Sequence, residues 1–568
     1  MDSWGAFGMW HIRTSAPGAS RHRRACAVLA VLALSAAATA AGPAHLHVQP
    51  ATPNRAAPTL DDLRAARDRL VALGFDVDRC GFDLHAGTLG VDVISDHDRA
   101  ALLAAGFTVS AEESLAPVAR TQTQYYDPDE IAAILQQAAI DHPAITHVFS
   151  IGTTYEGRPI WAIEISDNPG VPEDEPAILF NAQHHAREVA TSHVGIDVVE
   201  QLTNNYGSDA HVTDWVNDYK TVVVPMVNPD GVAYVFANHS SWRKNRQLHS
   251  CYGVDLNRNY PYLWGPGCGS SGTCSSDLYR GPSVASEFET QAMIALADTY
   301  HFVMATSYHS YGRFIDYPYA CATGAPSTLM PEHPVIDEMM NGMADAIDAV
   351  DSTPRYDVNS PVPAGGVNGD DTSWYYAYRG TYSFIVEVGT SFEPNFSLVA
   401  GIVSRNRAGW QYLYQRLGAA RIDVHVADAC SGAPLAAEVT LTNYAFDTGE
   451  LPRYTFLPYG RWTFMVPPNG TYTVRISKPG YVTQDVPVSV STLPAGIQVA
   501  LEQTSPPPTI YGDTDCDGDV DIADLQRFEE CLTGPVPAVD PGCSGLDAND
   551  DNHVDLLDFA AFQAAYTG

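Results

Sequence analysis

The feature that most restricts how this chain can fold is an apolar run that passes directly into a polar cluster and then into a helix, within residues 176–207. Residues 177–180 suit a strand buried on both faces, and residues 189–202 carry apolar side chains at helical spacing, with Gly207 beyond their end. In an open α/β sheet such a junction lies at the carboxyl end of a strand, where these folds place their active sites. The pattern therefore predicts an α/β domain with a functional site at this junction.

His185 and Glu188 stand three residues apart in the polar cluster, so the first turn of a helix would direct both side chains the same way. Imidazole nitrogens and carboxylate oxygens are zinc ligands, and a catalytic zinc takes three protein ligands and keeps a position open for water. By itself the spacing also describes an ordinary solvated pair on a helix. His309, which follows the strand-like run 302–307, is a third candidate ligand, although a lone histidine is more often structural.

The N-terminus has the pattern of a secretory signal peptide over residues 1–40. Arg21, Arg23 and Arg24 precede the apolar run 25–38, which ends in small residues. The run is shorter than the stretch of about 20 apolar residues that a membrane anchor needs. We therefore expect a secreted, extracellular protein without a membrane span in its mature form, either free or attached to a cell surface or scaffold.

Charge and cysteine content fit that compartment. The 568 residues exceed what one core can organise, and they carry a formal net charge of −36, which disfavours nucleic acid and favours calcium. Nine of the ten cysteines follow the signal peptide, so at least one is unpaired or pairs between chains. Disulfides are expected in an exported protein.

Residues 45–115 are predicted to form a small α/β unit, with a helix ending near Gly74, a strand over 89–93 and a helix from Asp96 to Gly106. The segment contains no cluster with evident chemistry. Its place in the chain suits a propeptide or folding assistant, with a plain accessory domain as the alternative. Arg120 is a candidate processing site.

Residues 122–420 alternate between strand and helix patterns, which predicts a mixed or parallel sheet with helices on both faces. Asp127 is expected to open a helix, and 162–165 and 221–226 are expected to be buried strands.

Residues 421–503 change character. Strand-like alternation between turn signals at Asn469-Gly470 and Pro479-Gly480 predicts an antiparallel β-sandwich with a packing or binding role. The proline-rich stretch 504–509 is a stiff linker.

The tail, residues 510–568, contains two copies of a calcium-loop pattern, each followed by a short apolar helix. The ligand positions are filled by Asp513, Asp515, Asp517 and Asp524 in the first copy and by Asp547, Asn549, Asp551 and Asp558 in the second. An acidic disordered tail would not explain two copies in register. The pair resembles a type I dockerin, an EF-hand-like module, which implies two structural calcium ions and docking onto a cohesin-like scaffold or surface protein.

Six motifs within 122–420 occur in the order and at the spacing typical of the zinc carboxypeptidase family. They are His-Ala-Arg-Glu (185–188), Asn-Pro-Asp-Gly (228–231), Trp-Arg-Lys (242–244), Gly-Val-Asp-Leu-Asn-Arg-Asn (253–259), Tyr-His-Ser-Tyr (308–311) and Tyr-Ser-Phe-Ile-Val-Glu (382–387). The resemblance implies a metallocarboxypeptidase fold and removal of C-terminal residues from peptides. The full expectation is an α/β chain whose mixed sheet is flanked by helices, with the α/β unit before it and the β-sandwich and paired calcium loops after it.

The resemblance also implies chemical roles. His185, Glu188 and His309 hold one zinc ion, which polarises the scissile carbonyl and acidifies a water molecule. Glu387 on a buried strand takes a proton from that water and delivers it to the leaving amine. Arg243 stabilises the developing oxyanion.

Substrate binding is carried over in the same way. Asn257 and Arg258 bind the terminal carboxylate of the substrate, a task that suits a forked guanidinium, and Arg187 contacts substrate further from the scissile bond. Cys251 and Cys274 match positions that form a disulfide in part of the family, and Cys268 lies near enough in sequence to compete.

Two departures concern closure over the substrate. Counted back from Glu387, the mobile tyrosine of the family falls at Gly365, and the aspartate before its tryptophan is Ser373. Either the alignment slips and another tyrosine such as Tyr356 serves, or closure is weaker.

The specificity pocket is the other open point. Thr372 aligns with the base of the pocket and favours apolar or mixed terminal residues, whereas Asp370 and Asp371 beside it could attract Lys or Arg. The alternatives to a carboxypeptidase are a zinc-dependent deacylase or cell-wall peptide hydrolase, and a surface-assembly protein whose peptidase domain is not catalytic.

Overall fold

The computed structural model describes most of the chain after the predicted signal peptide. The described residues are 44–50, 58–73, 75, 77–83, 87–93, 96–114, 124–238, 241–319, 330–351, 356–359, 367–504, 510–515, 518–532 and 541–567. The predicted signal peptide, Arg120, Gly365, Asp517 and nearly all of the 504–509 linker lie outside them. None of the described helices is long and apolar enough to cross a membrane.

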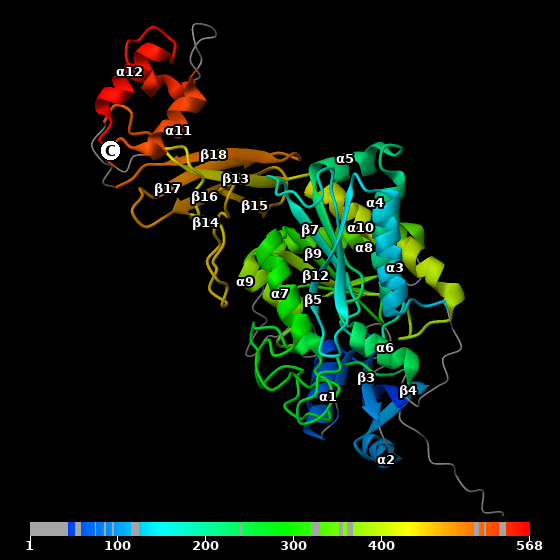
Figure 1. Cartoon of the computed structure of the whole chain (residues 1–568). Coiled ribbons are helices and arrows are strands. Elements are labelled where there is room, and N and C mark those ends of the chain that lie inside the picture. Colours follow the sequence, from blue (N-terminus) through cyan, green and yellow to red (C-terminus); the bar gives the residue numbers. More distant parts are fainter. Residues whose placement is uncertain are drawn as a thin grey trace, which may run out of the picture. The chain divides into compact units, whose positions relative to one another are not determined.

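An eight-stranded mixed sheet organises the described part of residues 124–417, as expected (Figure 1). Its four central strands run parallel, and antiparallel strands join on both sides. In spatial order the strands are β11 (Asp357–Asn359), β10 (Phe314–Asp316), β12 (Tyr382–Glu387), β9 (Met304–His309), β7 (Ala177–Ala182), β8 (Lys220–Val224), β6 (Pro159–Ile165) and β5 (Thr146–Thr153).

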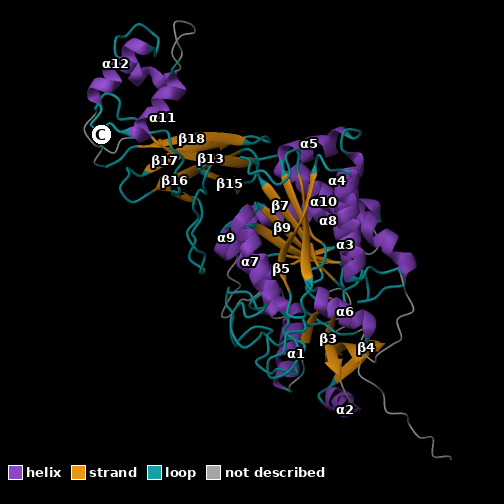
Figure 2. Cartoon of the chain, in the orientation of Figure 1, coloured by secondary structure: helices purple, strands orange, loops and turns teal. Residues whose placement is uncertain are grey.

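Helices cover both faces of this sheet (Figure 2). On one face α4, α8 and α10 pack together, with α3 and α5 against α4, while α7 and α9 pack together on the other. The helices are α3 (Pro128–Asp141), α4 (Thr191–Asn205), α5 (Ala210–Asp218), α6 (Pro229–Ala237), α7 (Phe288–Tyr300), α8 (His333–Val350), α9 (Asp371–Arg379) and α10 (Val399–Leu417), with short 3-10 turns at Leu256–Arg258 and Phe396–Leu398.

Local sequence accounts for these elements. Asp127 caps α3 in a reciprocal capping box with Glu130, as its position before the apolar pattern predicts. Every residue of β7 is buried, which explains its continuous apolar run. Buried side chains from the sheet and both helical layers form one continuous core.

The N-terminal unit is a four-stranded sheet with two helices and an apolar core of its own. Its strands, in the order β2-β3-β1-β4, are β2 (Val77–Asp83), β3 (Thr88–Val93), β1 (Ala44–Pro50) and β4 (Phe107–Ser114), and its helices are α1 (Leu60–Ala72) and α2 (Asp96–Ala104). The predicted helices and the predicted strand are therefore present.

Residues 421–501 form two three-stranded sheets around a separate apolar core. The first contains β15 (Arg461–Met465), β13 (Arg421–Asp428) and β18 (Ala495–Leu501), and the second β14 (Glu438–Leu441), β16 (Gly470–Ser477) and β17 (Gln484–Val490). The expectation of a purely antiparallel arrangement is wrong, because β13 and β18 pair in parallel. β18, the last strand of the unit, lies beside β13, the first, and because the two are parallel no hairpin can join them.

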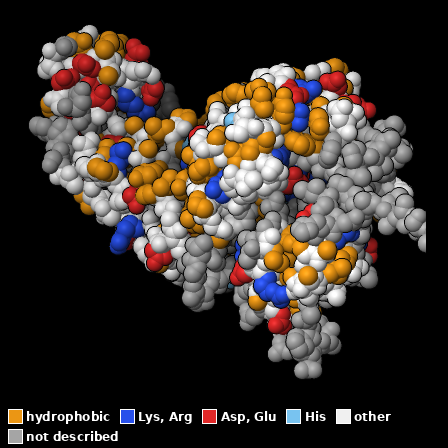
Figure 3. Space-filling model, turned by 90° about the horizontal axis from the view of Figure 1, so that it is seen from below, with side chains coloured by type: hydrophobic (Ala, Val, Ile, Leu, Met, Phe, Trp, Pro, Cys, Tyr) orange, Lys and Arg blue, Asp and Glu red, His pale blue; other side chains and the backbone are white. Residues whose placement is uncertain are grey.

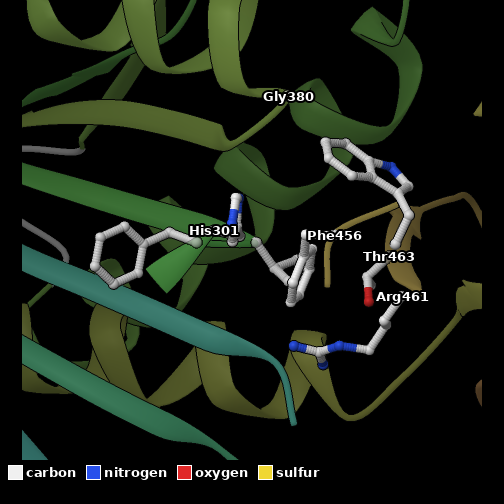
Figure 4. Close-up of a pocket in the computed structure, with 8 residues that line it drawn as sticks. His301, Gly380, Phe456, Arg461 and Thr463 are labelled. Carbon is white, nitrogen blue, oxygen red and sulfur yellow. The ribbon is translucent and has the colours of Figure 1, made fainter. Parts of the chain in front are cut away.

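Buried polar and aromatic contacts join these sheets to the main core. Arg453 forms an ion pair with the buried Glu332, with 2.6 Å between Nη1 and Oε2. The His301 imidazole stacks on the Phe456 ring at a centroid distance of 4.3 Å (Figure 4). A buried charge pair is costly to break, so the segment between β14 and β15 is held against the main core.

The described part of the tail consists of α11 (Ile522–Cys531), a 3-10 segment (Pro541–Leu546) and α12 (Leu556–Ala565) around a small apolar core. Both helices begin with the same capping box, formed by Asp521 with Asp524 and by Asp555 with Asp558. A disulfide between Cys531 and Cys543 closes the segment that follows α11. The two halves therefore repeat in structure as well as in sequence.

On the face drawn in Figure 3, Lys and Arg side chains of the described residues lie singly among acidic and apolar ones. That distribution agrees with the strongly negative net charge of the chain.

Candidate metal centre

The three predicted zinc ligands converge at the carboxyl ends of β7 and β9. His185 Nδ1 lies 2.7 Å from Glu188 Oε1 and 3.0 Å from His309 Nδ1, and His309 Nδ1 lies 3.1 Å from Glu188 Oε2. All three side chains are buried. Together they form a group able to hold one metal ion.

The expectation that His185 and Glu188 lie on the first turn of a helix is wrong. They occupy a turn before α4, in which the Glu188 amide donates to the His185 carbonyl. Gln183 adopts a left-handed conformation at the end of β7, and the Ala186 amide donates to the Arg243 carbonyl. These contacts hold the backbone in a turn, and the turn brings the two ligand atoms together.

The donor set suits a catalytic zinc, because two imidazole nitrogens and one carboxylate leave a position free for water. His185 Nε2 lies 3.1 Å from Asp255 Oδ1, so Nε2 carries the hydrogen and Nδ1 keeps its lone pair. His309 Nε2 lies 3.2 Å from Ser307 Oγ, which donates to Asn181 Oδ1. Both histidines thus turn a free lone pair toward Glu188, and the residues present fit the ion.

Asp255 connects the metal ligands to two arginines. Its Oδ2 accepts from Arg243 Nε at 3.0 Å and lies 3.8 Å from Arg258 Nη1. Burial opposes the charged carboxylate, but Arg243, Arg258 and His185 outweigh it and hold the pKa of Asp255 well below its usual range. Asp255 is therefore ionised at neutral pH.

Asp255 was not among the predicted site residues, although it lies inside the motif 253–259. An acidic residue two positions before the Asn-Arg pair was the available signal. Ser307 was missed as well, and no sequence pattern marks it.

Glu387 ends β12 directly beside His309, its register partner on β9, and is 2% exposed. Directly paired residues present their side chains on the same face of a sheet, so Glu387 lies on the face that carries the metal ligand. Arg243 is equally buried, with its Nη1 3.8 Å from Glu188 Oε1. A carboxylate and a guanidinium therefore flank the candidate metal position.

Asn257 and Arg258 lie in the 3-10 turn next to this cluster. Asn257 Nδ2 is 3.4 Å from His309 Nε2, and its Oδ1 accepts from the Asp371 amide at 2.9 Å. Arg258 donates to the carbonyls of Gly269 and Asn257. The main-chain contacts fix the guanidinium beside the metal ligands.

Arg187 lies further from the cluster. Its guanidinium stacks on the Phe392 ring at 4.0 Å and forms an ion pair with Asp277. Tyr311, two residues after His309, packs edge-on against the same ring and accepts or donates a hydrogen bond at 2.7 Å to His47 of β1. The N-terminal unit therefore contacts the rim of the candidate site.

Tyr356, the alternative to the mobile tyrosine, is buried in the main core. Its backbone amide donates to Asp348 Oδ1 of α8 at 3.0 Å. Its part in closure over the substrate stays a prediction.

Asp370 and Asp371, beside the predicted base of the specificity pocket, accept hydrogen bonds from neighbouring residues of α9. Asp370 caps α9, accepting from the Ser373 amide and from Thr372 Oγ1. Asp371 accepts from the Thr372 amide, and its other oxygen lies 3.8 Å from His184 Nε2. Both carboxylates are thus oriented by the first turn of α9 and by His184.

Cys251 and Cys274 form the disulfide that the family resemblance implied. Cys268 does not compete for it, because Cys268 is itself in another disulfide.

In the tail, Asp513, Asp515 and Asp524 bring carboxylate oxygens within reach of a single cation. Gly518 and Asn552 both adopt positive φ, 100° and 67°, at the sixth loop position, where a sharp turn is required. Asp547 accepts from the amides of Asp551 and Asn552, and Asn549 donates to Asp551. Asp558 accepts from the Ala548 and Asp555 amides, so its carboxylate faces into the second loop.

Comparison with known proteins agrees with this geometry. A family model described as zinc carboxypeptidase matches residues 131–403. Carboxypeptidase B from Astacus astacus is 30% identical over 49% of this chain and 90% of its own length. A zinc carboxypeptidase from Saccharothrix mutabilis subsp. capreolus is 37% identical over 36% of this chain and 49% of its own. The chain spans about half the length of the first curated relatives that it matches.

Among solved structures, carboxypeptidase A from Helicoverpa armigera superposes with a TM-score of 0.55 at 22% identity, over 66% of this chain and 96% of the other. At 22% identity this similarity supports a shared fold alone, which is a mixed sheet flanked by helices.

Proposed function

Because this chain belongs to the zinc carboxypeptidase family, we propose that it is a secreted zinc-dependent metallocarboxypeptidase that hydrolyses the C-terminal bond of peptides and proteins. The observation that carries the proposal is the convergence of His185, Glu188 and His309, with Glu387 beside His309 on the neighbouring strand. Export rests on the N-terminal sequence pattern.

A zinc ion held by His185, Glu188 and His309 supplies a Lewis acid for the scissile carbonyl and lowers the pKa of the attacking water. Glu387 is the proton carrier. It accepts a proton from the water as the nucleophile forms and then donates it to the leaving amine, so that a neutral amine departs. Its position beside His309 on the neighbouring strand supports this role.

Arg243 offers a fixed positive charge to the oxygen that becomes negative in the transition state. Asp255 accepts a hydrogen bond from Arg243 Nε and so orients the guanidinium. The same aspartate holds His185, so one buried carboxylate aligns the metal ligand and the oxyanion-stabilising group.

Asn257 and Arg258 are proposed to bind the free C-terminal carboxylate of the substrate. A guanidinium presents parallel donors that match a carboxylate, and this one is positioned by main-chain carbonyls. Arg187 with Phe392 would contact residues before the scissile bond.

The N-terminal unit is proposed to act as a propeptide. Its strand β1 reaches the site through the His47 contact with Tyr311, two residues beyond a proposed zinc ligand. A segment in that position would obstruct the approach of a substrate.

The tail is proposed to fold around two calcium ions and to dock onto a cohesin-like scaffold or surface protein. The proposed ligands are the residues predicted from the sequence, and the left-handed conformation of Gly518 and Asn552 at the sixth loop position supports the calcium hypothesis. The neighbouring carboxylates repel one another without a cation, which small apolar cores offset poorly.

A zinc-dependent deacylase or cell-wall peptide hydrolase is the second candidate, because it would use the same metal ligands. Arg243 with Asn257 and Arg258 favours ordinary peptide ends over these substrates. A non-catalytic platform is disfavoured because Glu387 is retained.

The deciding experiment is a turnover assay on unmodified peptides, an acylated amino acid and a cell-wall peptide fragment, with products identified by mass spectrometry. We expect single residues to be released from free C-termini, activity to be lost with a chelator and activity to return with zinc. Internal cuts, or turnover of the other substrates alone, would exclude the carboxypeptidase assignment.

A further inference from the structure

Another buried carboxylate lies on the catalytic face of the sheet, one strand away from Glu387. Asp316 ends β10, the strand next to β12, and is 2% exposed. Phe314 pairs directly with Glu387, and Asp316 pairs with Ile385. Directly paired residues share a face and alternate residues of a strand return to it, so Asp316 and Glu387 face the same side.

An independent contact supports this orientation. Tyr317, the residue after Asp316, donates its hydroxyl to Asp337 of α8 at 2.8 Å. Tyr317 therefore lies on the α8 face, and Asp316 lies on the opposite one. Ser383 lies on the same face of the sheet as Ile385 and Glu387. It donates to the Thr372 carbonyl of α9, so α9 covers this face at the end of β12 opposite Glu387.

These contacts define the surroundings of a substrate's last side chain. The proposed carboxylate anchor, Asn257, adjoins the start of α9 through the Asp371 amide. Two residues along β12 from Glu387, in the direction of α9, Ile385 pairs with Ser307 on one side and with Asp316 on the other. Two residues of strand span roughly 6.6 Å, which is within the reach of a Lys or Arg side chain.

We propose that Asp316 is the specificity-determining residue of this enzyme and selects C-terminal lysine and arginine. Asp316 would accept the ammonium or guanidinium group at the end of the side chain, while Arg258 holds the carboxylate. The proposal rests on the proposed carboxypeptidase function. It differs from the assignment to Asp370 and Asp371, whose carboxylates cap α9 and face His184.

The test compares peptides that differ only at the last residue: lysine, arginine, leucine and norleucine. Norleucine has the carbon chain of lysine without its charge. We expect kcat/KM for lysine to exceed that for norleucine at least tenfold. The Asp316→Asn variant should lose about 100-fold on lysine and arginine and change little on leucine.

The matched control is Asp337→Asn, which removes a carboxylate bound to the adjacent residue on the opposite face and should leave the lysine-to-norleucine ratio unchanged. Zinc content and thermal unfolding report whether Asp316→Asn is folded. Should it fail to fold, product inhibition of the wild-type enzyme serves instead: arginine should inhibit at least tenfold more strongly than norleucine.

Equal or better turnover of norleucine, equal losses on all peptides in Asp316→Asn, or equal inhibition by arginine and norleucine would overturn the proposal while leaving the carboxypeptidase function intact. Failure to release any C-terminal residue in the presence of zinc would overturn both.

Discussion

The metal centre of the sheet and the acidic loops of the tail were both recognised by ligand spacing, yet they are built differently. In the sheet, His185, Glu188 and His309 are buried, and the two histidines are oriented by Asp255 and Ser307. In the tail, the loop carboxylates are more exposed except at the twelfth position, and they accept hydrogen bonds from their own loop amides.

The difference indicates what each site requires of its ion. The sheet site is supported by a large core, so it should keep its shape when the ion is removed. The tail has a small core and many neighbouring charges, so its fold should depend on the cation. Catalysis needs the first arrangement, because reacting groups must be held in place.

The largest expected effect is the loss of the sheet site by His309→Ala. Removing one of three ligands should abolish zinc binding and turnover while the protein stays folded. Zinc content by atomic emission and thermal unfolding would check both points. Unfolding of the variant would contradict the view that the core, and not the ion, maintains this site.

The carboxylate anchor comes next in magnitude. Amidating the C-terminus of a peptide deletes the charge that Arg258 is proposed to bind, and such a charged hydrogen bond is worth roughly 2 to 5 kcal/mol. The free acid should therefore be cleaved far faster than the amide. Comparable kcat/KM values for the two would remove the role of Arg258.

Asp255→Asn tests whether the rigidity of the sheet site comes from its supporting contacts. The amide keeps the shape but loses the charge that holds His185 and Arg243. We expect a loss of about 10- to 100-fold in zinc affinity or kcat/KM. The matched control is Asp197→Asn on the opposite face, where Asp197 pairs with Arg407, and it should affect stability alone.

The tail should respond to calcium and not to zinc. Circular dichroism of the full chain, titrated with calcium and then with chelator, should show helix gained and lost in the wild type. Asp524→Ala with Asp558→Ala should remove this change and leave peptidase activity within about twofold. A calcium response that survives the double substitution would place the ions elsewhere.

The smallest expected effect concerns Glu289 of α7, buried near the Arg243 loop. Burial, with Glu287 and Asp230, raises its pKa to about 8 despite the hydrogen bond from Asn245. The folded protein then binds a proton that the unfolded chain releases near pH 4.5, so this group makes stability fall as pH rises from about 4.5 to 8. Glu289→Gln should make the fall shallower in denaturant titrations at pH 5 and pH 8, and an unchanged slope would contradict the raised pKa.

Much of the sheet domain could be predicted from sequence. Six motifs in order predicted the cluster of His185, Glu188 and His309, and the buried apolar run 177–180 predicted β7, because each motif and the run are themselves local signals. The turn at His185 could not be predicted, since it depends on the bond between Ala186 and Arg243, 57 residues apart in the numbering.

The remaining differences also arise from long-range pairing. The return of β18 beside β13 depends on two strands that are separated by the four other strands of the same unit. The three contacts of Asp255 depend on loops that meet only in the folded chain. The face of Asp316 follows from the register of β10 with β12, which a three-residue strand does not reveal by alternation.

The most direct test of the proposed catalytic mechanism is a paired measurement of zinc content and turnover for Glu387→Gln, beside the wild type. The substitution removes proton transfer and leaves all three metal ligands in place. We predict one zinc ion per chain in both proteins and a loss of kcat on the order of 10² or more in the variant. Near-normal turnover by a zinc-loaded Glu387→Gln protein would contradict the account.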